Sequence, residues 1–312
     1  EDMNQPIKEF VAECLGTLIL VTLGCGAVAA NVLKGSSDIS IGLGFGIGVL
    51  IGAVIAIPIS GGHLNPAVTI ALCSIRKCNW KKALYYIPAQ YIGAFLGSAI
   101  VYGIYHQGIQ EYENEFRKLA ENSNSTFDKV GLTGGIFATY PQTYLTVGQV
   151  LADQIFSCAI LMIAILAITD EKGINTPRAL QPLSIALVVC ALIISYGFNC
   201  GATLNPARDL APRVFTALAG YGLDVFKPLE GQYWWSAGLV APHIGAIIGA
   251  LIYALGIGMH NNNSDDSNAS LSTLVTVPIT KNDVIFQRAR QVITENMKVS
   301  PMDIEREMHR NY

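Results

Sequence analysis

The chain has 312 residues, of which 51% are hydrophobic and only 14% are charged, and its formal net charge is −3. Soluble globular domains carry about 25% charged residues, so this composition excludes an ordinary water-facing surface and indicates one that faces lipid. The near-neutral charge also excludes a strongly basic face, and we expect no binding to nucleic acid.

Six continuous apolar stretches are each long enough to cross a membrane as a helix, which takes about 20 residues. Their continuity disfavours a transmembrane β-barrel, whose strands alternate apolar and polar residues. Two shorter, semi-apolar segments, near 61–75 and 200–216, are too short to cross. We therefore predict an all-α membrane protein with six transmembrane helices and two re-entrant half helices, the transmembrane helices lying near 10–31, 41–59, 84–105, 149–169, 181–198 and 234–257.

The two short segments begin with related sequences, GGHLNPAVTIAL and CGATLNPARDLAPR, which indicates an internal duplication. Each repeat contains three spanning helices and one half helix. Because three is odd, the second repeat must enter the membrane from the opposite side, as in inverted-repeat transport proteins. We expect a channel domain over 1–258, with repeats at about 8–106 and 148–258, and a cytoplasmic tail over 259–312.

The basic residues of the short loops predict the orientation, because Lys and Arg accumulate on the cytoplasmic side. We expect both termini inside, the polar loop 106–148 outside, and the plasma membrane as the location. The outer loop contains the sequon Asn124-Ser125-Thr126, which predicts N-glycosylation of Asn124. The basic loop residues are Arg76, Lys77, Lys81, Lys82, Lys172 and Arg178.

Each half helix begins with Asn-Pro-Ala. Proline suits the first helical position and asparagine is a preferred N-cap. With its side-chain oxygen on the helix N–H groups, each asparagine is expected to direct both side-chain N–H bonds outward as donors. Two such tips at the midplane, each with the positive end of a helix dipole, suit neutral hydroxyl-bearing solutes and repel cations. The motifs are Asn65, Pro66 and Ala67, and Asn205, Pro206 and Ala207.

The backbone before each motif is expected to line a watery cavity, because non-helical backbone is tolerated in a membrane only there. Glu13 and Gln154, at matching positions of the two repeats, are interpreted as partners of this backbone, with a proton relay as the alternative. His63 is interpreted as a structural histidine rather than a pH gate. The predicted ladder of pore carbonyls comprises Gly61, Gly62, His63, Gly201, Ala202 and Thr203.

A charged residue inside a membrane segment is a functional hypothesis by default, and Arg208 is such a residue. It lies about 4.5 Å beyond Asn205 along the half helix. Topology places Phe45, Ile193 and Ala202 near the same level, which predicts a selectivity filter with one cationic donor and three apolar walls. Such a filter suits a solute with CH groups on one side and hydroxyls on the other. Packing or lipid-facing roles are the alternative for Phe45 and Ile193.

The sequence contains no nucleophile–base arrangement, phosphate-binding loop or metal-ligand cluster. We therefore expect no enzymatic activity, no cofactor and no metal. The seven cysteines form no CxxC pair and most lie in apolar runs, so we expect small buried residues without a metal or disulfide role.

Over about 8–258 the chain resembles the aquaporin family and, within it, the glycerol-conducting branch. The resemblance rests on AECLGTLILVTLGCG, GGHLNPAVTIAL and LNPARDLAPR. It implies a homotetramer with one pore per subunit, permeable to glycerol, water and other small neutral solutes such as urea. It also maps an aromatic/arginine filter onto Phe45, Ile193, Ala202 and Arg208. Ile193 and Ala202 differ from the usual family residues, which leaves the ranking of solutes open. The markers of the glycerol branch are Tyr140, Asp209, Arg213 and Pro242.

One ion pair and two rival protein classes remain to be considered. Asp209 should pair with Arg213 rather than Arg208, because residues four apart share a helix face. An ion-coupled transporter could also use inverted repeats, but it needs intramembrane acids, and only Glu13 qualifies. A non-conducting junction protein would not need two intact Asn-Pro-Ala motifs and Arg208. The sequence therefore favours a passive channel that excludes ions and protons.

Overall fold

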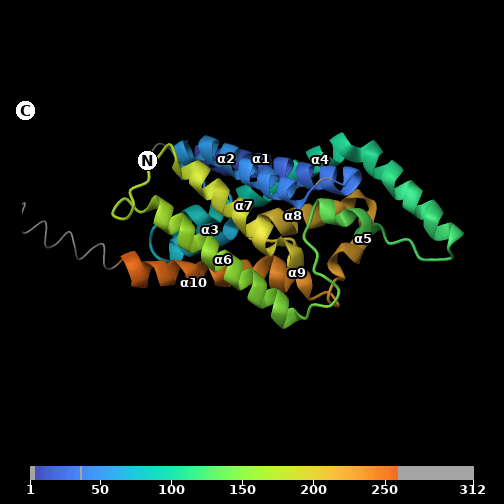
Figure 1. Cartoon of the computed structure of the whole chain (residues 1–312). Coiled ribbons are helices and arrows are strands. Elements are labelled where there is room, and N and C mark those ends of the chain that lie inside the picture. The colour runs from blue at the N-terminus through green and yellow to red at the C-terminus, as the bar shows by residue number, and fades with distance from the viewer. Residues whose placement is uncertain (1–3, 36, 259–312) are drawn as a thin grey trace, which may run out of the picture. The chain divides into compact units, whose positions relative to one another are not determined.

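Figure 1 shows a computed structural model of the chain, which describes residues 4–35 and 37–258. The predicted tail 259–312 lies outside the described residues. Within them the secondary structure is entirely helical, and six helices are long and apolar enough to span a membrane. This confirms the predicted fold class. The spanning helices are α1 (Gln5–Lys34), α2 (Asp38–Ser60), α4 (Trp80–Asn122), α6 (Val147–Thr169), α7 (Gln181–Cys200) and the helical run Tyr233–Gly258.

Two half helices and several short turns complete the described part. The half helices are α3 (Pro66–Ser74) and α8 (Pro206–Thr216), each starting at the proline of its motif. The last spanning run consists of α9 (Tyr233–Trp235), η4 (Ser236–Val240), α10 (Ala241–Tyr253) and η5 (Ala254–Gly258). The connecting turns are α5 (Lys129–Thr133), η1 (Gly134–Ile136), η2 (Ala217–Tyr221) and η3 (Gly222–Phe226).

The helices pack in two similar sets that exchange their half helices. α1 packs against α2 and α4, and α6 packs against α7 and α10. The sets meet where α2 packs against α7, and each half helix also reaches the opposite set, α8 against α4 and α3 against α10. This arrangement brings α3 and α8 to the middle of the bundle (Figure 1).

Glycines at matching positions allow the close helix contacts of each set. A Cβ atom at Gly93 of α4 would overlap the backbone carbonyl of Cys14, and one at Gly245 of α10 would overlap that of Ile155. Small residues let helix backbones approach closely inside a membrane, where packing rather than water exclusion drives association. The duplicated sequence thus produces a duplicated helix contact.

The predicted loop 106–148 is wrong over its first part, because α4 continues as a helix to Asn122. The apolar run ends near residue 105, but Ile109 and Glu113, four positions apart, keep one face of the polar extension buried. Glu113 accepts hydrogen bonds from Thr133 Oγ1 at 2.6 Å and Tyr221 OH at 3.1 Å. A hydropathy pattern detects the membrane crossing but not a helix continued by such contacts.

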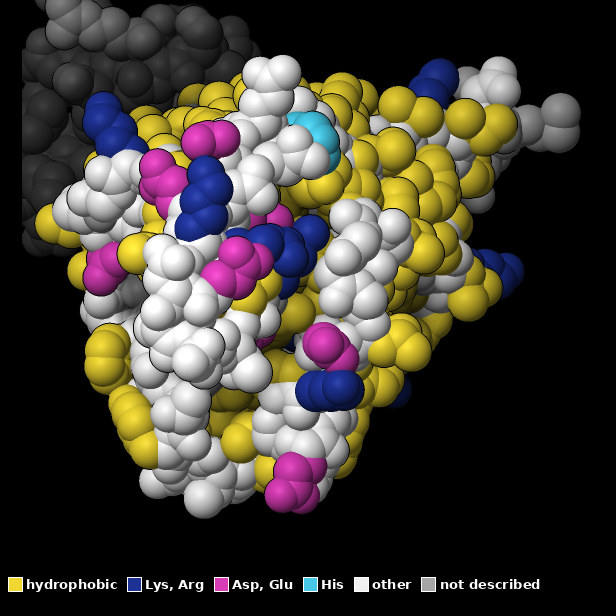
Figure 2. Space-filling view, turned by 90° about the vertical axis from the view of Figure 1, so that its right-hand side faces the viewer, with side chains coloured by type: hydrophobic (Ala, Val, Ile, Leu, Met, Phe, Trp, Pro, Cys, Tyr) yellow, Lys and Arg dark blue, Asp and Glu magenta, His cyan; other side chains and the backbone are white. Residues whose placement is uncertain are grey.

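The surface separates apolar flanks from a charged end. Figure 2 views the end at which α5 and the extension of α4 lie, and basic and acidic side chains gather around its centre while hydrophobic side chains cover the flank. Many large hydrophobic side chains of the spanning helices are exposed, such as Leu43, Leu84 and Leu187. Such a surface needs lipid as its solvent.

Candidate pore and selectivity filter

A cavity of about 820 Å³ passes between the two sets of helices. It is lined along α2 from Phe45 to Ile57 and along α7 from Gln181 to Ile193. About 12 residues of helix cover about 18 Å, more than half of a hydrocarbon core of about 30 Å. At the end of the cavity away from Phe45 and Ile193, the loops contribute the charged lining residues Lys77, Glu171 and Arg178.

The asparagines of both motifs lie at the ends of their half helices and line this cavity. Asn65 Oδ1 accepts from Ala67 N at 2.9 Å, and Asn205 Oδ1 accepts from Ala207 N at 3.0 Å. Both prolines occupy the first helical position. The predicted capping is therefore confirmed in both repeats.

Each asparagine uses one of its outward side-chain N–H bonds on the opposite loop. Asn65 Nδ2 donates to the Leu204 carbonyl at 2.9 Å, and Asn205 Nδ2 donates to the Leu64 carbonyl at 2.7 Å. The two loops meet so closely that each provides a buried carbonyl, which requires a donor. Each amide therefore cross-links the repeats with one N–H bond and retains the other.

Left-handed backbone at matching positions shapes the two loops. Leu64 and Leu204 have φ values of 53° and 52°, and Ala202 has a φ of 46°. Gly61, Gly62 and His63 line the cavity, as do Ala202 and Thr203. Gly201 does not line it: this exposed glycine ends α7 with a φ of 74°. The Thr203 carbonyl also accepts from Asn205 N at 2.5 Å and has a second lone pair.

A buried carboxylate holds the first loop. Glu13 accepts from the backbone N–H groups of His63 and Leu64 at 2.9 and 2.7 Å, and from Ser60 Oγ and Gln90 Nε2. These bonds confirm the interpretation of Glu13 as a partner of loop backbone. His63 Nδ1 is bonded to Thr69 Oγ1 at 3.1 Å, in keeping with a structural histidine.

The second loop is held more weakly at the equivalent point. Gln154 Oε1 accepts from Leu204 N at 3.3 Å, and its Nε2 donates to Asp153 Oδ1 at 2.9 Å. Hydrogen bonds to a charged acceptor are shorter and stronger than bonds between neutral groups. The first loop therefore has the stronger anchor.

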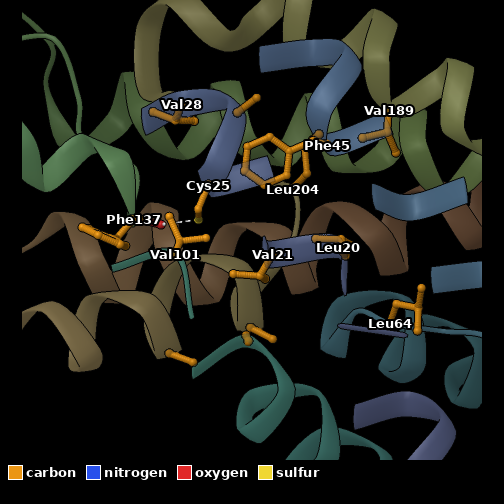
Figure 3. Packing of buried hydrophobic residues seen from close by; sticks show 14 of the residues in the cluster. Leu20, Val21, Cys25, Val28, Phe45, Leu64, Val101, Phe137, Val189 and Leu204 are labelled. Carbon is orange, nitrogen blue, oxygen red and sulfur yellow. Dashed lines mark hydrogen bonds between the residues drawn. The ribbon is translucent and has the colours of Figure 1, made fainter. Parts of the chain in front are cut away.

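Arg208 and Phe45 lie in contact at one end of the cavity. The guanidinium carbon of Arg208 lies 4.5 Å from the centroid of the Phe45 ring. Arg208 Nη1 donates to the Phe137 carbonyl at 2.9 Å, and Cys25 Sγ contacts the same carbonyl at 3.6 Å (Figure 3). Ile193 and Ala202 line the same cavity. The four predicted filter residues thus line one cavity, and Arg208 contacts Phe45 within it.

A buried ion pair next to Arg208 supports the loop that contains Thr139. Asp209 and Arg213 are fully buried, and Arg213 Nη2 lies 2.9 Å from Asp209 Oδ1, which confirms the predicted pairing. Asp209 Oδ1 also accepts from Thr139 N at 2.7 Å, and Arg213 donates to the Thr139 carbonyl. The guanidinium lies 4.7 Å from the ring centroid of Tyr140. Burial raises the pKa of Tyr140 to about 12, so its ring stays neutral.

Two observations complete the placement of the predicted residues. Pro242 is buried in the first turn of α10 and does not line the cavity. Phe137 and Thr139 were missed as positioning residues. Phe137 acts through its backbone carbonyl, whereas Thr139 also donates its hydroxyl to Asp209 at 2.5 Å; their only signal was the segment IFATYP. Among the described residues, no group of three or more His, Cys, Asp or Glu side chains could hold a metal ion.

Six spanning helices around two half helices, with a cavity between their tips, define a class of integral, multi-pass membrane proteins. The family model of the major intrinsic protein matches residues 2–253. The chain belongs to the major intrinsic protein family, whose members are membrane channels rather than enzymes.

Curated relatives and one solved structure agree with this family. The chain is 41% identical to aquaporin-9 of Homo sapiens over 262 residues, covering 83% of this chain and 85% of that protein. It is 42% identical to aquaglyceroporin-2 of Rhizophagus irregularis over 251 residues, 79% of this chain and 76% of the relative. The X-ray structure of the aquaglyceroporin from Plasmodium falciparum superposes with a TM-score of 0.70 at 31% identity, covering 80% of this chain and 95% of that one.

Proposed function

We propose that this chain is a passive channel for glycerol and water that excludes ions and protons. The observation that carries the proposal is the filter: Arg208 lies against Phe45 at one end of a cavity whose other walls there are Ile193 and Ala202. The names of the relatives, aquaporin and aquaglyceroporin, agree with permeation of water and glycerol.

The chemistry of this filter suits a polyol. Arg208 uses Nη1 on the Phe137 carbonyl, and the guanidinium has further N–H donors for solute hydroxyls. Phe45 and Ile193 offer apolar surface to the CH groups of the solute. Urea and other small neutral solutes of similar width belong to the same class of permeants.

The motif tips suit neutral solutes and oppose cations. Asn65 and Asn205 each retain one side-chain N–H bond after cross-linking the loops. A water molecule that accepts from both asparagines turns its hydrogens away from the centre, which interrupts a proton-conducting file. The two helix ends add about half a positive charge each, and Arg208 adds a full charge where screening is weak.

The lipid bilayer and other copies of the chain are the proposed partners. We infer a homotetramer with one pore per subunit, in the plasma membrane, with both termini cytoplasmic. The basic loop residues support this orientation. Native mass spectrometry from detergent measures the assembly directly, and a monomer as the main species would contradict it.

Stopped-flow light scattering of proteoliposomes tests the proposed route. We expect glycerol influx well above that of empty liposomes, and Ile193→Trp should abolish it because the larger ring fills the filter. Leu187→Trp is the matched control on the same helix, since Leu187 is 60% exposed and lies outside the cavity lining. Equal influx through both variants would contradict the route, and influx at background in the parent would contradict glycerol conduction.

A further inference from the structure

A second hollow lies beside the end of α3, outside the pore cavity. It has a volume of about 430 Å³ and opens to the surface. One of its residues, Lys77, also lines the pore cavity. The hollow is therefore adjacent to the rim of the pore. Its lining comprises Cys73, Arg76, Lys77, Cys78, Asn79 and Trp80.

The backbone turn after α3 brings two cysteines of this hollow together. Cys78 N donates to the Leu72 carbonyl at 3.2 Å, and Arg76 N donates to the Cys73 carbonyl at 3.1 Å. The chain thus folds back, and Cys73 and Cys78 line the same hollow. Both thiols are free.

The two thiols differ in access. Cys73 is buried, with 1% of its surface exposed, whereas Cys78 is partly exposed. Burial raises the pKa of the Cys78 thiol, and the Cys73 thiol and the ammonium group of Lys82 lower it again in part. The net effect leaves a small thiolate fraction at neutral pH. Cys78 is therefore the thiol that an oxidant reaches first, and Cys73 is the neighbour placed to react with the product.

We propose that Cys73 and Cys78 are a reversible disulfide site at the inner rim of the pore, oxidised by hydrogen peroxide. The Cys78 thiolate attacks one peroxide oxygen, giving a sulfenic acid and hydroxide. The Cys73 thiol then attacks the Cys78 sulfur, the disulfide forms, and the sulfenic oxygen leaves as water. Two thiols lose two electrons and one peroxide becomes two water molecules. On the cytoplasmic side, where thiols are kept reduced, such a bond is transient and responsive to oxidants.

Oxidation should act on the pore through Lys77. This residue precedes Cys78, and its backbone N–H already donates to the Leu72 carbonyl at 2.9 Å. A disulfide draws the two Cβ atoms to about 3.8 Å, which pulls Cys78 toward the end of α3 and thereby shifts the adjacent Lys77, a residue of the pore rim. We expect glycerol influx to fall at least two-fold; this part of the inference rests on the proposed function.

Peptide mapping tests the site on the purified full chain, independently of transport. After peroxide and thiol alkylation, trypsin cleaves at Arg76 and Lys77 and separates the two cysteines. We expect the tetrapeptide Cys78–Lys81 to be disulfide-linked to the peptide containing Cys73, and the link to disappear with dithiothreitol. Its yield should increase with pH as the thiolate fraction of Cys78 rises. Cys78→Ser removes the link, and Cys14→Ser, a change at another partly exposed cysteine, retains it.

Two outcomes would overturn the site: both cysteines still fully alkylated after peroxide, or Cys78 oxidised to sulfinic acid without a link to Cys73. Glycerol influx is then compared before and after oxidation in the parent and in Cys78→Ser. A linked protein with unchanged influx would overturn the coupling through Lys77. Absence of influx in the reduced parent would instead contradict the proposed function and leave the peptide result intact.

Discussion

At the scale of single residues, the position of Phe45 depends on a glycine of another helix. A Cβ atom at Gly24 of α1 would overlap the Phe45 ring, which lies on Arg208. Gly24 therefore determines where the Phe45 ring lies, although it does not line the cavity.

Gly24→Ala should push the ring toward Arg208 and narrow the filter. We expect glycerol influx to fall several-fold and water permeability to fall less, because water is the smaller permeant. Gly26→Ala is the control, since a Cβ at Gly26 meets no atom within 4 Å. Stopped-flow measurements of glycerol and water permeability in the two variants test this prediction. Equal glycerol influx would show that Gly24 does not position the Phe45 ring.

Arg208 and Phe45 together should keep cations out of the pore mouth. In the double variant Arg208→Ala/Phe45→Ala, we expect a proton or cation leak while solute flux survives, because the mouth loses its charge and becomes wider. The control is Arg117→Ala/Phe127→Ala, which removes a surface pair with a similar separation of 4.6 Å. Conductance of voltage-clamped cells with equal surface protein measures the leak. An ion-tight double variant that still conducts glycerol would make Arg208 a structural residue.

At this scale the sequence predicted side chains better than backbone contacts. Asn65, Asn205 and Arg208 are polar residues in apolar segments, and such exceptions stand out in a sequence. The carbonyls of Phe137, Leu64 and Leu204, which accept from these side chains, have no residue signature, because any amino acid provides a carbonyl.

At the scale of elements, the two re-entrant loops are related by duplication but held differently. Glu13 accepts two backbone hydrogen bonds from the first loop, at His63 and Leu64, and two side-chain bonds from Ser60 of α2 and Gln90 of α4. In the second repeat, the Gln154 side chain accepts one backbone bond, from Leu204. The sequence indicated both contacts, because a carboxylate and an amide occupy matching positions in otherwise apolar helices.

Glu13→Gln should destabilise the first loop. The amide group keeps the size of the carboxylate but turns two N–H bonds toward groups that are donors themselves. A hydrogen bond to a charged group contributes about 1.5–3 kcal/mol, so we expect a loss of at least ~2 kcal/mol. Thermal unfolding in detergent measures it, with Glu111→Gln on the exposed face of α4 as control. Equal midpoints for the two variants would contradict the anchoring role.

The extension of α4 shows what patterns of apolar residues leave out. Residues 106–122 are too polar to resemble a membrane helix, and their burial depends on partners far along the chain, Thr133 and Tyr221. Contacts of that kind arise only when the outer turns fold together. The crossing itself, at 84–105, was predictable because lipid selects a continuous apolar stretch.

At the scale of the whole molecule, the orientation of the chain in the membrane determines which end of the pore faces the cytoplasm. Asn124 lies exposed in the turn that follows α4. Its sequon lies on the side opposite to the basic loops at Lys77 and Arg178, so it should meet the glycosylation machinery if those loops are cytoplasmic.

Asn124 should therefore be glycosylated in eukaryotic cells. An endoglycosidase should increase the gel mobility of the parent, and Asn124→Gln should migrate like the treated parent. Exposure of this loop to protease on intact cells provides an independent reading of topology. Protection of the loop from protease would show that the chain has the opposite orientation, whereas absence of the glycan alone would not.

Solute should cross through this chain down its own gradient while ions and protons do not. This expectation is tested by loading proteoliposomes with a pH-sensitive dye, applying a glycerol gradient without any ion gradient, and then applying a pH gradient with an ionophore to balance charge. We expect rapid, sustained swelling in glycerol, none in sorbitol, and an internal pH that changes no faster than in empty liposomes. Glycerol entry that requires an ion gradient, or rapid proton entry through the parent chain, would contradict it.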